Sequence, residues 1–584
     1  MDIKAQRDKR LGKIRELIKK ENLFGYLVPS WDEYGAGECS SNLKRLEYVI
    51  GFSGSNGIAI ITQDQILLMT DGRYLAQAAI ELCGSNYLII NQSESDYSKH
   101  LPLDVLVGYD AKLFTKKHIS FLNGLRLVKI AENFVDTIWT ERDQKSKSQY
   151  FEYSAVYSGI SAQAKIALCT EFMKQQDAQY LVITDPITSN WILNIRGNDL
   201  IHTPVLLSRA IIKKEKVLFF VRNAESFVPL EEWQDLVEIL EEESFEQSLL
   251  NLNASTAVVD PKSTAVHFIE LLSQKHHAIE RTSPVEMHKA CKNTTELEWA
   301  RLRHIQDAVA LCEAFAELVE ICLSGGVSFK EYDVTQLLVK YRQLSQGYIC
   351  ESFAAICGFR ENGAIIHYRP DLQNSKILSQ GIILIDSGGH YLGGTTDVTR
   401  NLVLGGLATQ EQKIKYTQVL KGHIALASAS FPKGTTGKHL DVLARQFLRH
   451  DGYDYPHGTG HGVGNCLSVH EGPQNISSIS DVILQSGMIL SNEPGYYKEG
   501  EYGIRIENLC YIKESDLLKG FLCFEQLTVV PYCSALLEFS ALSIQEMSFL
   551  KNYYYQIQKL VVPLLSHRAK KWCMDEIENV LVRI

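Results

Sequence analysis

The sequence predicts a multidomain protein of mixed α and β structure, in which two α/β domains precede a larger α+β domain. Three observations support this prediction. A chain of 584 residues exceeds the roughly 250–300 residues at which a single hydrophobic core stops growing. A helix-then-strand pattern occurs twice in the first half, which predicts domains over residues 1–148 and 149–291. Residues 292–584 instead alternate apolar runs with glycine-rich turns and end in a helical tail.

Composition and charge exclude several classes of function. A net charge of −10 argues against nucleic acid as a partner, because a nucleic-acid surface needs excess positive charge. The chain has no apolar run of the ~20 residues that span a bilayer, and its first residues lack the apolar stretch of a secretory signal. Thirteen cysteines occur without a Cys-x-x-Cys pair, which suits free thiols in a reducing compartment. We therefore expect a cytoplasmic protein that binds neither membranes nor nucleic acid.

The first two domains share an order of elements. Residues 4–21 form a predicted amphipathic helix, followed by predicted strands at 24–28, 58–61 and 66–70. After a polar linker at 141–148, a predicted helix at 161–175 precedes a strand at 180–184. The triplet beginning at Tyr26 and the triplet beginning at Tyr180 both read Tyr-Leu-Val. This order favours a duplicated domain, although a chance match of short apolar triplets is the alternative.

The rest of the second domain and the start of the third follow from local patterns. Residues 205–208 and 217–221 are predicted strands, and the acidic run 231–243 is predicted to be a solvated helix. Thr295 and Glu298 have the spacing of a capping box, which would open a long helix through residue 322, ended by Gly325 and Gly326. Further helices are predicted at 329–341, 410–427, 438–450 and within the tail, 543–584.

Acidic residues follow strands and glycine turns in the third domain. The apolar run 382–385 predicts a buried strand that ends at Asp386. A glycine turn and a second strand at 395–404 would form a hairpin that brings Asp386 beside Asp397. Two such carboxylates repel unless a proton or a cation lies between them. Alternation along a later strand places Arg505, Glu507 and Leu509 on one face, so Glu507 can project into the same space.

The same domain supplies a histidine and a fourth acid in glycine-rich segments, His461 and Glu493. Four carboxylates and one imidazole suit two divalent cations that share bridging oxygens. Carboxylate-rich sites favour Mn²⁺, and Zn²⁺ or Co²⁺ also accept them. Each acid taken singly is better explained as a surface residue beside a glycine turn, whereas the ordered set favours a metal site.

The series Asp386, Asp397, His461, Glu493 and Glu507 resembles the metal-ligand set of the pita-bread metallopeptidases, which include methionine aminopeptidase, prolidase and aminopeptidase P. The segments His-Gly-Thr-Gly-His-Gly-Val-Gly, from residue 457, and Glu-Pro-Gly-Tyr-Tyr, from residue 493, are most similar to the cytosolic three-domain Xaa-Pro aminopeptidases. The resemblance implies a pita-bread catalytic domain over 292–584, behind two related α/β domains.

The resemblance also implies a role for each site residue. Asp386 would hold one of two divalent cations, most simply Mn²⁺, Asp397 and Glu507 would bridge both, and His461 and Glu493 would hold the other. Glu493 would also transfer a proton. His367 and His470 would contact substrate and stabilise the tetrahedral intermediate, and His457 would line a proline pocket. Tyr497 and Arg505 would contact substrate or orient the carboxylates. The histidines His304, His390 and His423 are expected to be structural or exposed.

The implied activity is removal of the N-terminal residue from peptides with proline second, by hydroxide held between two metals, in a homodimer. Prolidase, which cleaves Xaa-Pro dipeptides, is the alternative within the family, but its chains have a single N-terminal domain. A non-catalytic peptide-binding pita-bread module is the alternative of another class, and such modules lose metal ligands. The tail is expected either to pack on its own domain or to contribute to a dimer interface.

Overall fold

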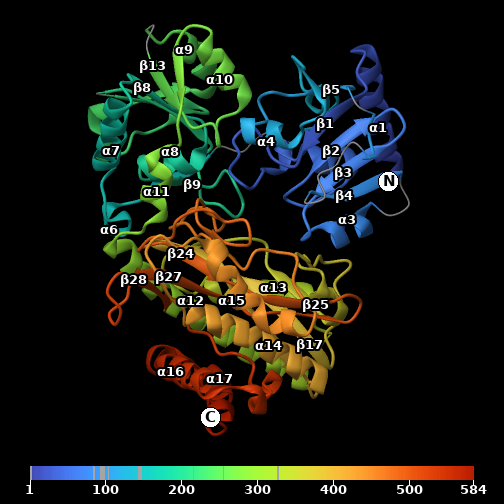
Figure 1. The fold of residues 1–584 in the computed structure, drawn as a ribbon, viewed down its shortest axis with the longest axis vertical. Coiled ribbons are helices and arrows are strands. Elements are labelled where there is room, and N and C mark those ends of the chain that lie inside the picture. The colour runs from blue at the N-terminus through green and yellow to red at the C-terminus, as the bar shows by residue number, and fades with distance from the viewer. Residues whose placement is uncertain are drawn as a thin grey trace. The chain divides into compact units, whose positions relative to one another are not determined.

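The chain forms two units in the computed structural model, which describes residues 3–82, 86–92, 99–102, 104–142, 148–214, 216–253, 256–324 and 328–584. The first unit comprises Met1–Ala155, Ile160–Ile201 and Val205–Glu286, and the second comprises Val156–Gly159, His202–Pro204 and Met287–Ile584 (Figure 1). The domain boundaries expected near residues 148 and 291 stay predictions, and the linker expected at 141–148 lies mostly outside the described residues. No helix in the described ranges combines the length and the apolar character needed to cross a membrane.

The first unit contains two six-stranded sheets with the same order and directions. The first sheet has the order β4-β3-β2-β1-β5-β6 and the second has β12-β11-β10-β8-β13-β14. In the first sheet β1 pairs antiparallel with β2, β2 antiparallel with β3, and β3 parallel with β4, while the pairs β1–β5 and β5–β6 are parallel. The second sheet repeats this pattern: β8–β10 and β10–β11 are antiparallel, and β11–β12, β8–β13 and β13–β14 are parallel. Two sheets of one topology confirm the predicted relationship between the two α/β domains. Their strands are β1 (Gly25–Pro29), β2 (Ile58–Thr62), β3 (Ile66–Thr70), β4 (Tyr87–Asn91), β5 (Leu106–Tyr109), β6 (Arg126–Lys129), β8 (Tyr180–Ile183), β10 (Ser208–Ile212), β11 (Val217–Val221), β12 (Val237–Glu241), β13 (Thr256–Val259) and β14 (His277–Glu280).

Helices flank these sheets, and two predicted ones are confirmed. The predicted helix at 4–21 is α1 (Ile3–Lys20), whose Ile14 and Ile18 are fully buried. The predicted helix at 161–175 is α7 (Ala162–Gln175), and Ser161 caps it by accepting the backbone N–H of Ala164. The other helices of this unit are α2 (Arg45–Ile50), α3 (Leu75–Glu81), α4 (Lys116–Phe121), α5 (Phe134–Ile138), α8 (Pro186–Ile192), α9 (Phe245–Leu250) and α10 (Val266–Ser273), and the short strands β7 (Tyr150–Glu152) and β9 (Ile195–Gly197) pair with each other.

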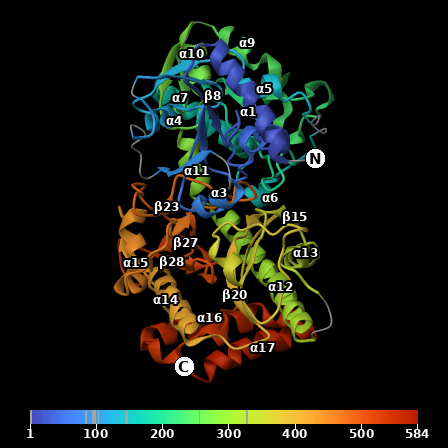
Figure 2. The same cartoon turned by 90° about the vertical axis from the view of Figure 1, so that its right-hand side faces the viewer.

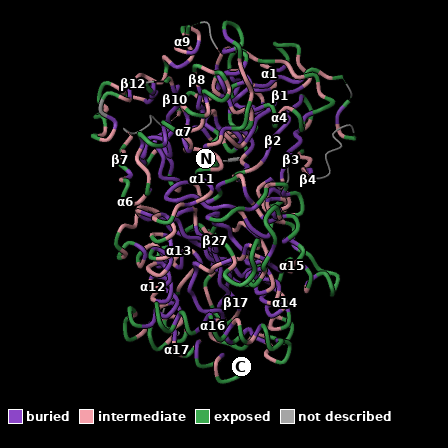
Figure 3. The backbone as a smooth tube through the Cα atoms, turned by 60° about the vertical axis from the view of Figure 1, so that its left-hand side comes forward, coloured by how far each residue is buried: buried purple, intermediate pink, exposed green. Residues whose placement is uncertain are grey.

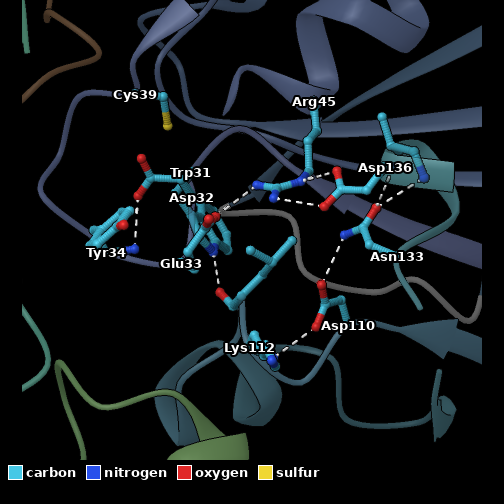
Figure 4. A network of polar contacts seen from close by, with 12 residues as sticks. Trp31, Asp32, Glu33, Tyr34, Cys39, Arg45, Asp110, Lys112, Asn133 and Asp136 are labelled. Atoms are coloured by element: carbon cyan, nitrogen blue, oxygen red, sulfur yellow. Dashed lines mark hydrogen bonds and ion pairs between the residues drawn. The ribbon is translucent and has the colours of Figure 1, made fainter. Parts of the chain in front are cut away.

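A polar network holds the loop that follows β1. The Arg45 guanidinium binds Asp136 at 2.7 and 3.0 Å and Glu33 at 3.0 Å (Figure 4). Asp32 Oδ1 accepts the backbone N–H of Tyr34 at 2.9 Å, and burial raises the pKa of Asp32 to about 6. A bidentate Arg–carboxylate pair fixes geometry as well as charge, so this loop is tied to α2 and α5.

Two predictions for the second sheet are wrong. Residues 205–207 are buried but do not form a strand, which begins only at Ser208. The Asn190 side chain takes the place of a neighbouring strand: its Oδ1 accepts the Leu206 N–H at 2.9 Å, and its Nδ2 donates to Leu206 O at 2.8 Å. The acidic run 231–243 is not a helix, because it contains a 3₁₀ turn and the edge strand β12, parallel to β11. Charged residues are common on edge strands, where they discourage aggregation.

The second unit packs helices around several small antiparallel sheets. The α12 helix (Thr294–Ser324) packs against α13 (Glu331–Arg342) and α17 (His567–Leu581), while α14 (Gln410–Ala427) packs against α15 (Gly437–His450) (Figure 2). Together with α16 (Ile544–Leu560), these confirm the predicted helices of the domain and of its tail. The α11 helix (Pro284–Ala290) lies at the junction of the two units in the sequence, and α6 is Ala155–Ser158.

The capping box of α12 lies two residues earlier than predicted. Asn293 and Glu296 form it: Glu296 donates its N–H to Asn293 Oδ1 at 3.1 Å, and Asn293 donates its N–H to Glu296 Oε2 at 3.0 Å. Asparagine is at least as good an N-cap as threonine, so the first of two overlapping signals is used. The glycines predicted to end this helix, 325 and 326, lie outside the described residues.

The strands of the second unit carry the acidic residues. One sheet has the order β16-β17-β20, and β17, labelled in Figure 3, is buried from residue 382 to 387. The predicted strand that would hold Arg505, Glu507 and Leu509 on one face is wrong, because it is broken between β26 and β27 and Glu507 lies in the break. The strands are β15 (Tyr348–Glu351), β16 (Ile356–Phe359), β17 (Gly381–Ser387), β18 (Gly389–Tyr391), β19 (Gly394–Thr395), β20 (Val398–Leu404), β21 (Ser430–Pro432), β22 (Gly460–His461), β23 (Asn475–Ile476), β24 (Ile489–Asn492), β25 (Gly495–Lys498), β26 (Tyr502–Arg505), β27 (Asn508–Glu514) and β28 (Phe521–Gln526).

Candidate metal centre

Four carboxylates and one imidazole meet in the second unit. The His461 Nε2 atom lies 3.4 Å from Asp397 Oδ2 and 3.6 Å from Glu493 Oε1. Ligand atoms of Asp397, His461 and Glu507 all lie within 4.8 Å of one another. Asp386 is close enough to raise the pKa of Asp397 and Glu507 through its charge. The fold therefore brings together all five residues whose order in the sequence suggested a metal site.

Antiparallel pairing places Asp386 and Asp397, and a residue of the same strand pair holds Glu507. Strands β17 and β20 pair with Asp386 opposite Thr399 and Ser387 opposite Val398, so Asp397 stands just before the paired segment. Thr399 then holds Glu507 twice: its Oγ1 donates to Glu507 Oε2 at 2.8 Å, and its carbonyl accepts the Glu507 N–H at 3.2 Å. The hairpin predicted from the sequence thus exists, and Glu507 reaches it through Thr399 rather than by strand alternation.

A close backbone approach places the histidine beside Glu493. A side chain at Gly460 would put its Cβ 1.9 Å from the carbonyl oxygen of Ser491, so only glycine fits there. The Ser491 hydroxyl accepts the His461 N–H at 2.9 Å and donates to Glu493 Oε1 at 3.1 Å. His461 Nδ1 pairs with Gly462 O at 2.9 Å. A carbonyl oxygen can only accept a hydrogen bond, so this contact puts a proton on Nδ1 and directs Nε2 toward the carboxylates.

The electrostatics of the centre suit bound cations. Burial, and then the charges of neighbouring acids, hold the pKa of Asp397 and that of Glu507 well above their usual range. Burial also raises the pKa of Glu493, although His461 and Arg505 oppose it. Asp386 Oδ1 is buried without a hydrogen-bond partner among the described residues. Crowded carboxylates, one of which has a buried oxygen without a partner, together with an imidazole nitrogen directed at them, fit divalent cations.

A chain of hydrogen bonds links Asp386 to His457. Arg505 donates from Nη2 to Asp386 Oδ2 at 2.6 Å and from Nη1 to the Tyr497 hydroxyl at 2.8 Å. The Tyr497 hydroxyl lies 2.8 Å from His457 Nε2. Burial raises the pKa of Tyr497 to about 12, so the phenol keeps its proton at neutral pH. Arg505 and Tyr497 therefore support the carboxylates from behind, while His457 ends the chain.

The two remaining predicted histidines, His470 and His367, are connected to the centre through different contacts. The His470 ring centroid is 4.2 Å from that of His461. The next residue, Glu471, is buried and pairs with Lys292 Nζ at 2.7 Å, which anchors the loop. His367 follows a 3₁₀ turn, and the carbonyl of the preceding Ile366 lies 3.4 Å from Arg505 Nη2.

Sequence reasoning missed the residues that support this centre. Thr399, Ser491 and Glu471 contact or anchor the predicted ligands, but short polar side chains within strands and loops give no signal of their own. The three histidines expected to have no role, His304, His390 and His423, are all buried and bonded to protein groups: Ala300 O, Thr395 Oγ1 and Asn492 O respectively. Their structural placement agrees with that expectation.

Four family models match successive parts of the chain. A model of metallopeptidase family M24 matches residues 303–514, and one of the C-terminal region of peptidase M24 matches 520–580. Two models of the creatinase/prolidase N-terminal domain match residues 10–137 and 141–296.

Relatives resemble the chain over nearly its whole length. It is 36% identical to a probable Xaa-Pro aminopeptidase P of Laccaria bicolor, over 97% of this chain and 92% of that protein. It is 34% identical to Xaa-Pro aminopeptidase 1 of Dictyostelium discoideum, over 98% and 96%. Among solved structures, an X-prolyl aminopeptidase of Caenorhabditis elegans superposes with a TM-score of 0.90 at 29% identity and covers 99% of both chains. That protein is described as a cytosolic enzyme with a di-nuclear active site.

Proposed function

The chain belongs to metallopeptidase family M24, and on that premise we propose that it is an Xaa-Pro aminopeptidase, which releases the first residue of a peptide whose second residue is proline. The observation that carries the proposal is the set of five donor residues gathered around Asp397, in a chain similar to named Xaa-Pro aminopeptidases almost from end to end. A peptide-binding module without catalysis would have no need of that donor set.

Two divalent cations would be held by the five donors, with Asp386 on one, Asp397 and Glu507 between them, and His461 and Glu493 on the other. When bound, such cations lower the pKa of a water molecule between them enough to supply hydroxide near neutral pH. The carboxylate-rich donor set favours Mn²⁺. The di-nuclear site of the Caenorhabditis elegans enzyme supports the count of two.

Glu493 carries the proton in this mechanism. Glu493 lies in the donor set beside the attacking water, so its carboxylate would accept the proton that this water releases. The Ser491 hydroxyl holds Glu493 Oε1 at 3.1 Å and fixes its position for that transfer. Glu493 then gives the proton to the departing proline nitrogen, which must be protonated to leave.

The histidines handle the peptide. Attack on the carbonyl makes an oxyanion, which needs hydrogen-bond donors where its charge develops. His470, beside His461, and His367 supply those donors. His457 lines the pocket for the proline ring of the substrate. The Tyr497 hydroxyl, 2.8 Å from His457 Nε2, fixes the orientation of the imidazole.

Proline in the second position explains the need for a dedicated site. The amide before proline is tertiary and has no N–H, so a peptidase that recognises that N–H loses its contact. A pocket for the ring next to the metal centre replaces it. As further parts of the same proposal, the enzyme is cytosolic and acts as a homodimer, as its resemblance implies.

Peptide cleavage tests the proposal. The protein, loaded with Mn²⁺, is incubated with Arg-Pro-Pro and with the dipeptide Arg-Pro, and free arginine is measured by mass spectrometry. We expect release from the tripeptide and little from the dipeptide. Cleavage of the dipeptide alone would replace the proposal with prolidase activity, and cleavage of neither would reject it. Asp397→Asn serves as the inactive control, because it removes a bridging carboxylate at nearly constant volume.

A further inference from the structure

A fully buried carboxylate on α13 organises the segment that carries His367. Glu331 has no exposed surface. Its Oε1 accepts the Phe359 N–H at 2.7 Å and Asn362 Nδ2 at 2.9 Å. Its Oε2 accepts the Tyr368 hydroxyl at 2.8 Å, the Lys376 N–H at 2.9 Å and Asn362 Nδ2 at 3.1 Å. One side chain therefore gathers four positions that span eighteen residues of chain.

His367 lies between two of these anchored positions. Asn362 belongs to the 3₁₀ turn Arg360–Ala364, and Tyr368 directly follows His367. The Tyr368 N–H donates to Ile365 O at 3.0 Å, which closes a turn around His367. Because Glu331 bonds on both sides of that turn, it limits how far the His367 backbone can shift.

Two residues of strand β26, Arg505 and Gly503, also contact this segment. Arg505 Nη2 lies 3.4 Å from Ile366 O while it also binds Asp386. Gly503 packs so closely that a Cβ there would lie 1.7 Å from Gly363 O. The turn bearing His367 is thus held both by Glu331 and by strand β26, and β26 also carries the arginine that binds Asp386.

We propose that Glu331 is a positioning residue for His367, acting through Tyr368 and Asn362, and that this determines how well His367 contacts the substrate carbonyl. This inference rests on the proposed function. A carboxylate is suited to the task because it has about four acceptor sites and no hydrogen to donate. A glutamine would present N–H groups to at least one of the donors that now bind Glu331, and that buried donor would lose its partner.

The first test removes a single hydrogen bond. Tyr368→Phe deletes the hydroxyl that binds Glu331 and leaves the ring. We expect kcat to fall ~10-fold while KM changes less than about twofold, because a catalytic group is misplaced and binding is not. Tyr341→Phe is the matched control: its hydroxyl also donates to a glutamate, Glu317, away from the metal centre. Equal kcat values for the two variants would overturn the proposal.

The second test is a double-mutant cycle. We expect Glu331→Gln to lower kcat ~30-fold in the wild-type background and hardly at all in a His367→Ala background, because its effect passes through that imidazole. Multiplied losses in the double variant would show that Glu331 acts elsewhere, and so would a loss of bound metal in Glu331→Gln alone.

A third measurement does not depend on activity. Hydrogen exchange of the peptide covering residues 360–368 should be at least ~10-fold faster in Tyr368→Phe and Glu331→Gln than in the wild type. Peptides of the unit that contain none of the positions bound by Glu331 should be unchanged. Unchanged exchange in this peptide would refute the anchoring by Glu331 even if no peptide substrate were cleaved. If the wild-type protein cleaves no peptide but the variants still exchange faster, the anchoring by Glu331 stands. Only the proposed function is then rejected, and with it the catalytic role of His367.

Discussion

Arg505 and Asp386 share one short hydrogen bond, 2.6 Å from Nη2 to Oδ2, while the second oxygen of Asp386 is buried without a partner among the described residues. Leaving a buried carboxylate oxygen unsatisfied costs about 1–3 kcal/mol or more. The arrangement is stable in an enzyme if a cation takes the unpartnered oxygen. In that case Arg505 would hold Asp386 Oδ2 in place, and the cation would bind Oδ1.

Replacing Arg505 should weaken metal binding. Arg505→Lys keeps a positive charge but cannot bind Asp386 and Tyr497 with one planar fork, so we expect Mn²⁺ affinity to fall about 10–100-fold. Isothermal titration of metal-depleted protein measures it. Arg342→Lys is the control, because Arg342 is equally buried and pairs with Asp307 outside the centre. An unchanged dissociation constant in Arg505→Lys would contradict this role.

Metal removal should destabilise the protein. Without cations, the buried carboxylates of Asp397, Glu493 and Glu507 repel one another, so chelation should lower Tm and added Mn²⁺ should restore it. Asp397→Asn relieves part of the repulsion and removes a donor, so its Tm should respond much less to Mn²⁺. Scanning calorimetry measures both effects. A response equal to that of Asp516→Asn, a change at an exposed carboxylate, would count against Asp397 as a ligand.

The Tyr497 hydroxyl should act through its two partners. Tyr497→Phe removes the bonds to Arg505 and His457, so we expect kcat/KM for Arg-Pro-Pro to fall ~10-fold, with most of the loss shared with His457→Ala. Steady-state kinetics of the two single variants and of the double variant measure how much of the loss in kcat/KM the two substitutions share. Tyr511→Phe, which loses a bond to Arg301 instead, should behave like the wild type. Fully additive losses would mean that Tyr497 does not act on His457.

Acid should destabilise the protein partly through His423. Burial, and then the charge of Arg400, lower the pKa of His423 to about 3, whereas an exposed histidine titrates near 6.5. Below pH 6.5 the unfolded chain therefore binds a proton that the native chain does not, so the free energy of unfolding decreases as the pH is lowered. Between pH 6.5 and 5 the loss from this residue is about 2 kcal/mol.

Urea unfolding at pH 6.5 and 5 tests this. We expect His423→Gln to lower stability at both pH values, because it disturbs the contacts with Asn492 and Tyr532, and to reduce the difference between them. His450→Gln, at an exposed position, should leave that difference unchanged. The same acid-induced loss in His423→Gln as in the wild type would show that other groups cause it.

Long periodic segments were predictable because their local pattern agrees with their environment. The helices α1, α7, α14 and α15 and the buried strand β17 follow directly from apolar spacing. The acidic run 231–243 was not, because charge alone does not tell an exposed helix from an edge strand. Residues 205–207 look like a strand by composition, yet the Asn190 side chain satisfies Leu206.

By itself, the sequence determined which chemical groups are available: five donor residues in a fixed order, each after an apolar run or within a glycine-rich segment. Only the tertiary structure decided how they are held. Thr399 bonds Glu507 across 108 positions of sequence, and Arg505 bonds Asp386 across 119. Glu331 organises the turn around His367 with five hydrogen bonds, none of which a sequence pattern indicates. The physical reason is that local propensity extends over a few residues, whereas a buried polar group takes whichever partner the folded chain brings within hydrogen-bond distance.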